Sequence, residues 1–288
     1  MPATVKKLLD LLDLEDIEHN IYRGRNRDIG TGRIFGGQVL AQALVAARRT
    51  VDDDKPAHSL HGYFILEGDL AAPVVYFVDR LRDGRSYCTR RVTAIQHGEA
   101  IFNMSGSFHR KEEGLEHQMT MRDTVAPEGL RDELDVIRER AEEIPRSVRP
   151  VLTQDRVLDI RPVEPDDPFK AEPRAPRQRY WMRTVQKVPD DDPLLHQAIL
   201  AYASDYGLLG AALRPHGVTF RDPGIMVASL DHAIWFHRPF RMDDWLLYVV
   251  ESPTSGAGRG FSRGTFFTRD GTLVASVAQE GVVRVRRG

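Results

Sequence analysis

Three polar side chains interrupt apolar runs in the second half of this chain, and together they carry the groups needed to activate a water molecule. Asp205 lies in LLHQAILAYASDYGLLGAAL, residues 194–213, where the neighbours three and four positions away are apolar. Ser229 lies in the apolar run GIMVASLDHAIWF, and Gln279 follows alternating residues in LVASVAQEGVVRV. A carboxylate, a hydroxyl and an amide can hold one water and remove its proton.

Each of these residues also has a structural interpretation. Burying a lone carboxylate is costly, so Asp205 must be hydrogen-bonded, paired, protonated or placed at the edge of a cavity. In a structural role, Asp205 would hydrogen-bond nearby backbone where a helix meets its sheet. Ser229 can bond its own strand, and Gln279 can face solvent at a sheet edge. For each residue alone the structural interpretation is the commoner one, so only the combination favours a catalytic site.

Histidines form the rival site. His58 and His61 lie three apart in AHSLHGYF, and His232 and His237 occupy the matching part of the second half. Metal ligands three apart suit a helix, whereas a strand would place the first two on opposite faces. We therefore interpret these histidines as polar core or surface residues and expect no metal site.

Other reactive motifs are weak. The single cysteine, Cys88, excludes an intramolecular disulfide and a cysteine-clustered zinc site, and its alternating context predicts a packing residue. The glycines of SGAGRGFSRG lack the strand–turn–helix context and the spacing of a dinucleotide site, so they predict a turn before a strand. No GxSxG elbow or phosphate loop occurs.

Composition limits the classes of partner. The 288 residues are 41% hydrophobic and 28% charged, with a formal net charge of -2, which argues against a dedicated nucleic-acid binder. No apolar stretch approaches the roughly 20 residues that span a bilayer. The acidic, amphipathic N-terminus does not have the pattern of a signal peptide. We expect a cytoplasmic protein that binds neither nucleic acid nor membrane.

The apolar periodicity predicts helices and strands in two similar series. Helices are expected at 5–17, at 35–51 and over the whole of 194–213, and a charged helix at 128–148 that Pro145 ends. The proline-rich stretch 161–178 predicts an extended connection. Strand-like runs occupy 60–68, 73–84, 85–98, 99–110 and 179–188.

The second series of strands repeats the first. Phe64 and Phe236 correspond at an offset of 236 − 64 = 172, Arg85 and Arg259 at 259 − 85 = 174, and Gly98 and Gly271 at 271 − 98 = 173. This period is too long for a solenoid and indicates a duplicated domain. An antiparallel sheet that wraps one apolar helix would account for each copy.

Eight motifs carry a family resemblance. They are FGGQVLAQAL, HSLHGYF, LRDGRSYCTRRVTAIQHG, AYASDYGLL, PHGVTF, SLDHAIWFHRPFRMDDWLLY, GRGFSRG and VASVAQEG. Together they resemble the acyl-CoA thioesterase II family through almost the whole chain. The resemblance implies an α+β double hotdog, with an N-terminal hotdog at 1–112, a connecting helix and linker at 113–150, and a C-terminal hotdog at 151–288.

The resemblance also implies a reaction, which is hydrolysis of fatty acyl-CoA to free acid and CoA without a metal or redox cofactor. The family's catalytic Asp of YxSD, Ser or Thr before (L/I)DH, and Gln of QEG fall on Asp205, Ser229 and Gln279. Asp205 would act on a water, although direct attack by its carboxylate stays open. Helix-terminal backbone near Gly36 and Gly37 is a candidate to bind the oxyanion.

Two alternatives and one assembly prediction accompany this assignment. A hotdog-fold enoyl-CoA hydratase would need an Asp/His pair near the helix, and His196 lies nine residues before Asp205. A non-catalytic acyl-CoA-binding module would not need the three polar residues. Fused hotdogs often associate further, so we expect a homo-oligomer, either a dimer or a tetramer.

Overall fold

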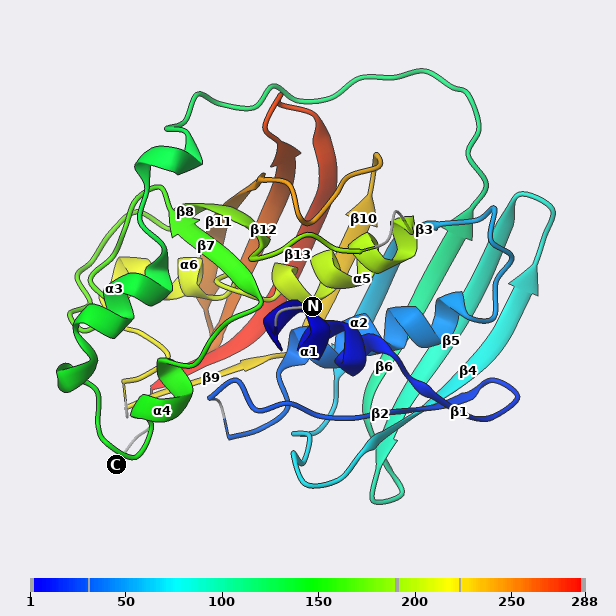
Figure 1. Cartoon of the computed structure of the whole chain (residues 1–288), viewed down its shortest axis with the longest axis horizontal. Coiled ribbons are helices and arrows are strands. Elements are labelled where there is room, and N and C mark those ends of the chain that lie inside the picture. The colour runs from blue at the N-terminus through cyan, green and yellow to red at the C-terminus, as the bar shows by residue number, and fades with distance from the viewer. Residues whose placement is uncertain (1–2, 31, 190–191, 223, 286–288) are drawn as a thin grey trace.

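The structure is a computed structural model that describes residues 3–30, 32–189, 192–222 and 224–285 (Figure 1). Its first half contains α1 (Ala3–Leu12), β1 (Glu15–Glu18), β2 (Ile21–Gly24), α2 (Gly36–Arg48), β3 (Ala57–Phe64), β4 (Val74–Asp83), β5 (Tyr87–Gln96) and β6 (Glu99–His109). A connecting segment carries 3-10 turns at Pro127–Gly129 and Ala141–Glu143, with α3 (Glu133–Glu139) and α4 (Arg149–Leu152). The second half contains β7 (Leu158–Pro162), β8 (Arg177–Thr184), α5 (Pro193–Ser204), α6 (Gly210–Leu213), a 3-10 turn at Arg214–His216, β9 (Ile225–Ser229), β10 (Asp231–Phe236), β11 (Leu246–Gly256), β12 (Arg259–Thr268) and β13 (Leu273–Val285).

One antiparallel sheet joins the two halves. At its centre β3 pairs with β10, and His61 lies opposite Ala233. From this seam the order is β6, β5, β4, β2, β1 in one direction and β13, β12, β11, β8, β7 in the other, while β9 pairs with β13. The matching orders on the two sides are those of a duplicated unit, and they confirm an α+β fold.

The long helices α2 and α5 pack against each other under the curved sheet (Figure 1). Residues 37–47 of α2 and 196–204 of α5 are all buried, which explains why both helices are apolar on nearly every side. The N-terminal helix α1 packs over α2, where Gln42 Nε2 donates to the Leu11 carbonyl at 2.7 Å. The predicted pairing of each sheet with a central helix is therefore confirmed.

The prediction of a single helix over 194–213 is wrong. α5 ends at Ser204, with Asp205 as its C-terminal cap, and α6 begins only at Gly210. Gly207 adopts a left-handed conformation with φ of 72°, which a continuous right-handed helix does not contain. Asp205 therefore lies at a helix end, and the turn after it leaves its side chain free to face another element.

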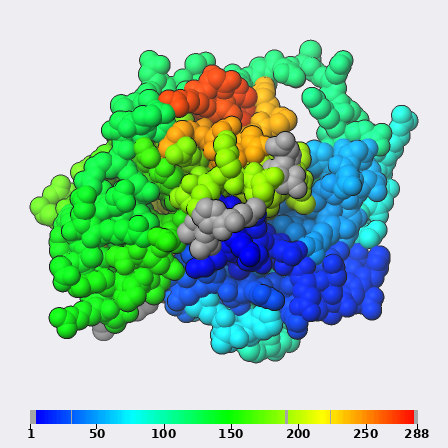
Figure 2. Space-filling view, in the orientation of Figure 1, coloured from blue at the N-terminus to red at the C-terminus, as the bar shows by residue number. Residues whose placement is uncertain are grey.

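The connecting segment also differs from its prediction. The charged helix expected at 128–148 is reduced to α3 between two 3-10 turns, and β7 forms where 161–178 was expected to begin an extended connection. The segment lies against the second half, where Trp181 Nε1 donates to the Val125 carbonyl at 2.8 Å. Figure 2 shows this green segment along the left side of the molecule and the blue first half at the lower right.

The described ranges lack both a membrane-spanning helix and a cluster of metal-binding side chains. None of the helices found there is long and apolar enough to cross a membrane. The same residues contain no group of three or more histidine, cysteine, aspartate or glutamate side chains placed to hold a metal ion.

Replacing Gly207 with alanine tests the helix break. The added Cβ would lie 3.0 Å from the Tyr180 hydroxyl, in a backbone conformation that alanine disfavours. We expect Gly207→Ala to lower the free energy of unfolding by about 1–3 kcal/mol in urea denaturation. Gly210→Ala is the matched control, since its Cβ would meet no atom closer than 3.5 Å. Equal stabilities of the two variants would contradict this interpretation of the turn.

Candidate active site

The structure brings Asp205, Ser229 and Gln279 into one hydrogen-bonded chain. Gln279 Nε2 donates to Asp205 Oδ1 at 2.8 Å and to Ser229 Oγ at 2.8 Å. The three side chains come from the end of α5, the end of β9 and the middle of β13. Gln279 and Asp205, which lie 74 positions apart in sequence, are thus bonded directly.

Asp205 is also held by the first half of the chain. Its Oδ2 accepts a hydrogen bond from the Gly37 backbone N–H at 2.9 Å, in the first turn of α2. A carboxylate at the C-terminal end of α5 faces the unfavourable end of that helix dipole, whereas the N-terminal end of α2 attracts its charge. The meeting of the two helix ends therefore stabilises a carboxylate that α5 alone would disfavour.

The two glycines of the FGGQ motif permit this approach. A Cβ on Gly36 would lie 2.8 Å from Asp205 Oδ2, and a Cβ on Gly37 would lie 2.4 Å from the Tyr202 carbonyl oxygen. The sequence predicts that helix-terminal backbone near these glycines binds the oxyanion. In the structure, the Gly37 N–H is bonded to Asp205.

Burial and existing hydrogen bonds determine which donors and acceptors of each side chain remain available. Gln279 is 1% exposed, and its amide nitrogen is already bonded to both neighbours. Its visible effect is to fix the carboxylate relative to the hydroxyl. Ser229 accepts from Gln279, so the hydroxyl keeps its own hydrogen for a further acceptor. The Asp205 side chain is 8% exposed and retains lone pairs beyond the two that are bonded.

His232 lies beside the three hydrogen-bonded side chains. His232 is fully buried on β10, and its Nδ1 is 3.9 Å from Asp205 Oδ1. Burial lowers its pKa below the usual value of a histidine, so the ring is neutral near pH 7. Strand alternation, which places it inward with Ile234 and Phe236, was the signal in the sequence that could have linked it to the site.

The other candidate groups lie in separate contacts. His58 Nε2 is 2.8 Å from Ser107 Oγ, and the exposed His61 contacts the ring of Trp235. His237 Nε2 is 2.8 Å from Ser276 Oγ.

The arginines of GRGFSRG have acidic partners. Arg259 pairs with Glu280 at 2.9 Å, and Arg263 pairs with Glu251 at 2.6 Å. Both pairs are solvent-exposed, so these arginines fit a role in pairing neighbouring strands.

The strand register identifies the equivalent positions in the first half. Gln279 pairs with Ser262 in one copy, and Gly106 pairs with Arg90 in the other, at offsets of 279 − 106 = 173 and 262 − 90 = 172. Ser229 pairs with Gly281 as Ala57 pairs with Phe108, at an offset of 229 − 57 = 172. The carboxylate at the α5 end corresponds to Arg49, the C-terminal cap of α2. The first copy therefore lacks the three polar groups at these positions.

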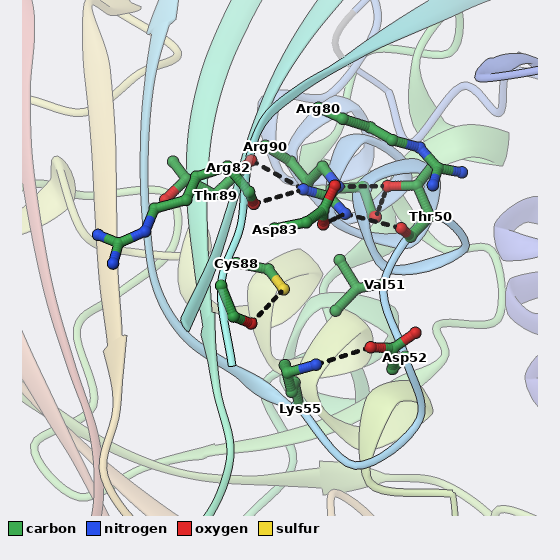
Figure 3. A network of polar contacts seen from close by, with 12 residues as sticks. Thr50, Val51, Asp52, Lys55, Arg80, Arg82, Asp83, Cys88, Thr89 and Arg90 are labelled. Atoms are coloured by element: carbon green, nitrogen blue, oxygen red, sulfur yellow. Dashed lines mark hydrogen bonds and ion pairs between the residues drawn. The ribbon is translucent and has the colours of Figure 1, made fainter. Parts of the chain in front are cut away.

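In the first copy, the buried Arg90 lies at the centre of a polar network beside the end of α2 (Figure 3). It is 1% exposed, and its guanidinium donates to Thr50 Oγ1 at 2.7 Å and to the Thr50 carbonyl at 2.9 Å. It also bonds the carbonyls of Arg82 and Thr89 and the carboxylate of Asp83. A buried cation saturated in this way ties the end of α2 to the sheet.

Removal of Arg90 tests this structural role. Arg90→Met leaves several buried acceptors without a donor, so we expect the free energy of unfolding to fall by about 3 kcal/mol. Arg91→Met, on the exposed face of the same strand, is the control and is expected to change stability by less than about 0.5 kcal/mol. Urea denaturation measures both, and similar losses in the two variants would refute the role of Arg90.

A cavity of about 160 Å³ adjoins the C-terminal end of α5. Tyr202 and Tyr206, on either side of Asp205, line it, and both rings contact Phe35 just before the two glycines. The remaining lining residues are Arg27, Ile29, Glu133, Val151, Leu152, Gln154, Asp155, Arg156 and Val157. The first half, the connecting segment and the second half thus all contribute to the walls.

Comparison with known proteins agrees with this architecture. Residues 149–282 match the acyl-CoA thioesterase family, and residues 24–109 match the acyl-CoA thioesterase N-terminal domain. The chain is 38% identical to acyl-CoA thioesterase 2 of Haemophilus influenzae over 99% of both chains. It is 41% identical to the crystal structure of an acyl-CoA thioesterase II, TesB2, from Mycobacterium marinum, over 98% of both chains with a TM-score of 0.79.

A more distant structure bears on the fold alone. A protein from Alicyclobacillus acidocaldarius described as having a hot dog fold superposes with a TM-score of 0.75 at 18% identity, covering 96% of this chain and 98% of that one. The double hotdog expected from the sequence is confirmed. The chain belongs to the acyl-CoA thioesterase family and is a thioester hydrolase.

Proposed function

We propose that this enzyme hydrolyses fatty acyl-CoA to a free fatty acid and CoA, with Asp205 as the general base that activates a water. The observation that carries the proposal is the chain Asp205–Gln279–Ser229, because it aligns a carboxylate and a hydroxyl through one amide. The names of the relatives point to the same substrate class.

The reaction needs one proton acceptor and one nucleophile. Asp205 takes a proton from water as the water oxygen bonds to the thioester carbonyl carbon, and the carbonyl π electrons move to oxygen. The tetrahedral intermediate then collapses, and the C–S bond breaks with its electron pair on sulfur. The proton held by Asp205 goes to that sulfur, which releases CoA and restores the carboxylate.

Ser229 and Gln279 act by orientation. Gln279 holds Asp205 and Ser229 at fixed positions, and the free hydroxyl hydrogen of Ser229 is available to bind the water oxygen. Fixing the water between base and carbonyl removes orientational entropy before the reaction, which can contribute several kcal/mol to the rate.

The cavity beside Tyr206 is the proposed path for the acyl-thioester. Its apolar walls, which include Ile29, Val151, Leu152 and Val157, suit methylene groups, and Arg27 and Arg156 lie at the same cavity. Location in the cytoplasm stays a prediction from the composition and the N-terminal pattern, and assembly into a dimer or tetramer stays a prediction from the expected fold.

Substitution of the three polar residues tests the catalytic assignment. We expect Asp205→Asn to lower kcat by roughly 10²–10⁴-fold because it removes the base while keeping the shape of the side chain. Ser229→Ala and Gln279→Ala should each lower kcat by up to about 10²-fold through lost orientation. Release of CoA from palmitoyl-CoA, followed with a thiol reagent, measures all three, and melting temperatures report the fold.

Two outcomes would overturn the proposal. If the wild-type protein at micromolar concentration released no thiol, an acyl-CoA-binding module without turnover would explain the fold better. If Asp205→Asn unfolded the protein but left activity per folded molecule unchanged, the carboxylate would be structural.

A further inference from the structure

A buried histidine behind Asp205 has an acceptor atom without a partner. His232 is fully buried, and its Nδ1 has no hydrogen-bond partner among the described residues. Asp205 Oδ1 is 3.9 Å away, which is too long for a hydrogen bond. A buried polar atom left unpaired costs free energy comparable to a lost hydrogen bond, so its retention calls for a cause.

Hydrogen bonding determines which nitrogen carries the proton. When the Ser204 hydroxyl donates its single hydrogen to the Ala201 carbonyl at 3.0 Å, it accepts from His232 Nε2, which is 2.9 Å away. In the neutral ring Nε2 therefore bears the hydrogen, and Nδ1 presents a lone pair. Ser204 fixes the tautomer that directs an acceptor toward Asp205.

The groups around the ring leave this lone pair facing the base. Asp205 and Asp231 are the charged groups close enough to influence its pKa, and the Asp231 carboxylate already accepts from the Glu280 backbone N–H. Nδ1 and Asp205 Oδ1 are thus two acceptors with no hydrogen between them, and two lone pairs repel. A proton on Oδ1 would turn the repulsion into a hydrogen bond about 1 Å shorter than the present separation.

The other copy of the domain shows that the fold does not require a histidine here. The equivalent of His232 is Leu60, at 232 − 60 = 172, and Leu60 is also fully buried. Leu60 belongs to the copy that lacks the carboxylate, hydroxyl and amide. At this position of the fold, an imidazole is therefore present in the copy that holds the base and a leucine in the other copy.

We propose that His232 is a positioning residue that holds, with Asp205, the proton taken from the water until the leaving sulfur accepts it. This inference rests on the proposed function. Because His232 is fully buried, it acts through Asp205 and not on the substrate.

The proton can be followed through each step. When the water oxygen bonds to the carbonyl carbon, its proton passes to Asp205, and on Oδ1 that proton is donated to the His232 Nδ1 lone pair. When the C–S bond breaks, the electron pair stays on sulfur, and the same proton moves from the Asp205–His232 pair to the thiolate. Imidazole and carboxylate return to their starting states without another reactant.

The first test replaces the ring but keeps its bond to Ser204. A glutamine amide can donate to Ser204 Oγ in place of His232 Nε2, but it places no acceptor where Nδ1 was. We expect His232→Gln to keep its melting temperature and KM while kcat falls roughly tenfold to 10²-fold. His237→Gln is the matched control, because that exposed histidine also contacts a serine through Nε2 and should keep full kcat.

A second variant, Ser204→Ala, retains both His232 and Asp205. Ser204→Ala suits the helix and removes the acceptor that fixes the tautomer, so the ring can put its proton on Nδ1 and donate to Asp205. A base bonded in that way accepts a proton less readily, and we expect kcat to fall with KM unchanged. Full kcat in Ser204→Ala would overturn the inference even if His232→Gln failed to fold.

Assaying Asp205→Asn alongside these variants distinguishes a failure of the proposed function from a failure of the role of His232. If Asp205→Asn loses turnover while folded His232→Gln keeps full kcat, the role of His232 is refuted and the proposed function survives. If Asp205→Asn keeps turnover, the proposed catalytic role of Asp205 fails and the role of His232 fails with it. Loss of kcat in both, with His237→Gln unchanged, supports the inference.

Discussion

The hydrogen bond from the Gly37 N–H to the Asp205 carboxylate is the contact on which the site depends. It joins the first turn of α2 to the C-terminal cap of α5, so the two halves of the chain meet at a carboxylate. A carboxylate at the end of α5 is unfavourable for that helix, and the facing end of α2 offsets the cost. Glycines at 36 and 37 and the left-handed turn at Gly207 all serve this approach.

The duplication gave two copies of this arrangement, and the copies diverged in opposite directions. In the second copy the sheet contributes Gln279, Ser229 and His232 around the carboxylate. In the first copy the buried Arg90 guanidinium bonds the Thr50 hydroxyl and carbonyl just beyond α2. The C-terminal cap of α2 is an arginine and that of α5 is an aspartate, so the second copy places a proton acceptor at this helix end.

Much of the fold could be predicted because apolar periodicity and the repeat are local signals. Asp205, Ser229 and Gln279 are identifiable as polar residues in apolar runs. Their residue types suggest that they share one water, and the family resemblance points to the same three positions. The break after Ser204 was missed because the positive φ of Gly207 leaves no trace in an apolar pattern. Alternation along β10 indicates that His232 points inward, but its proximity to Asp205 depends on how the strand packs against the end of α5, which spacing along one strand does not encode.

The central claim is that a water held by Asp205 attacks the thioester, and an isotope measurement tests it most directly. The enzyme would turn over palmitoyl-CoA repeatedly in water enriched in heavy oxygen, followed by mass spectrometry of the product acid and of the peptide that contains Asp205. We expect the acid to gain heavy oxygen while the Asp205 peptide keeps its mass. Heavy oxygen in the Asp205 carboxylate would contradict it, because label enters there through an anhydride formed by direct attack of that side chain.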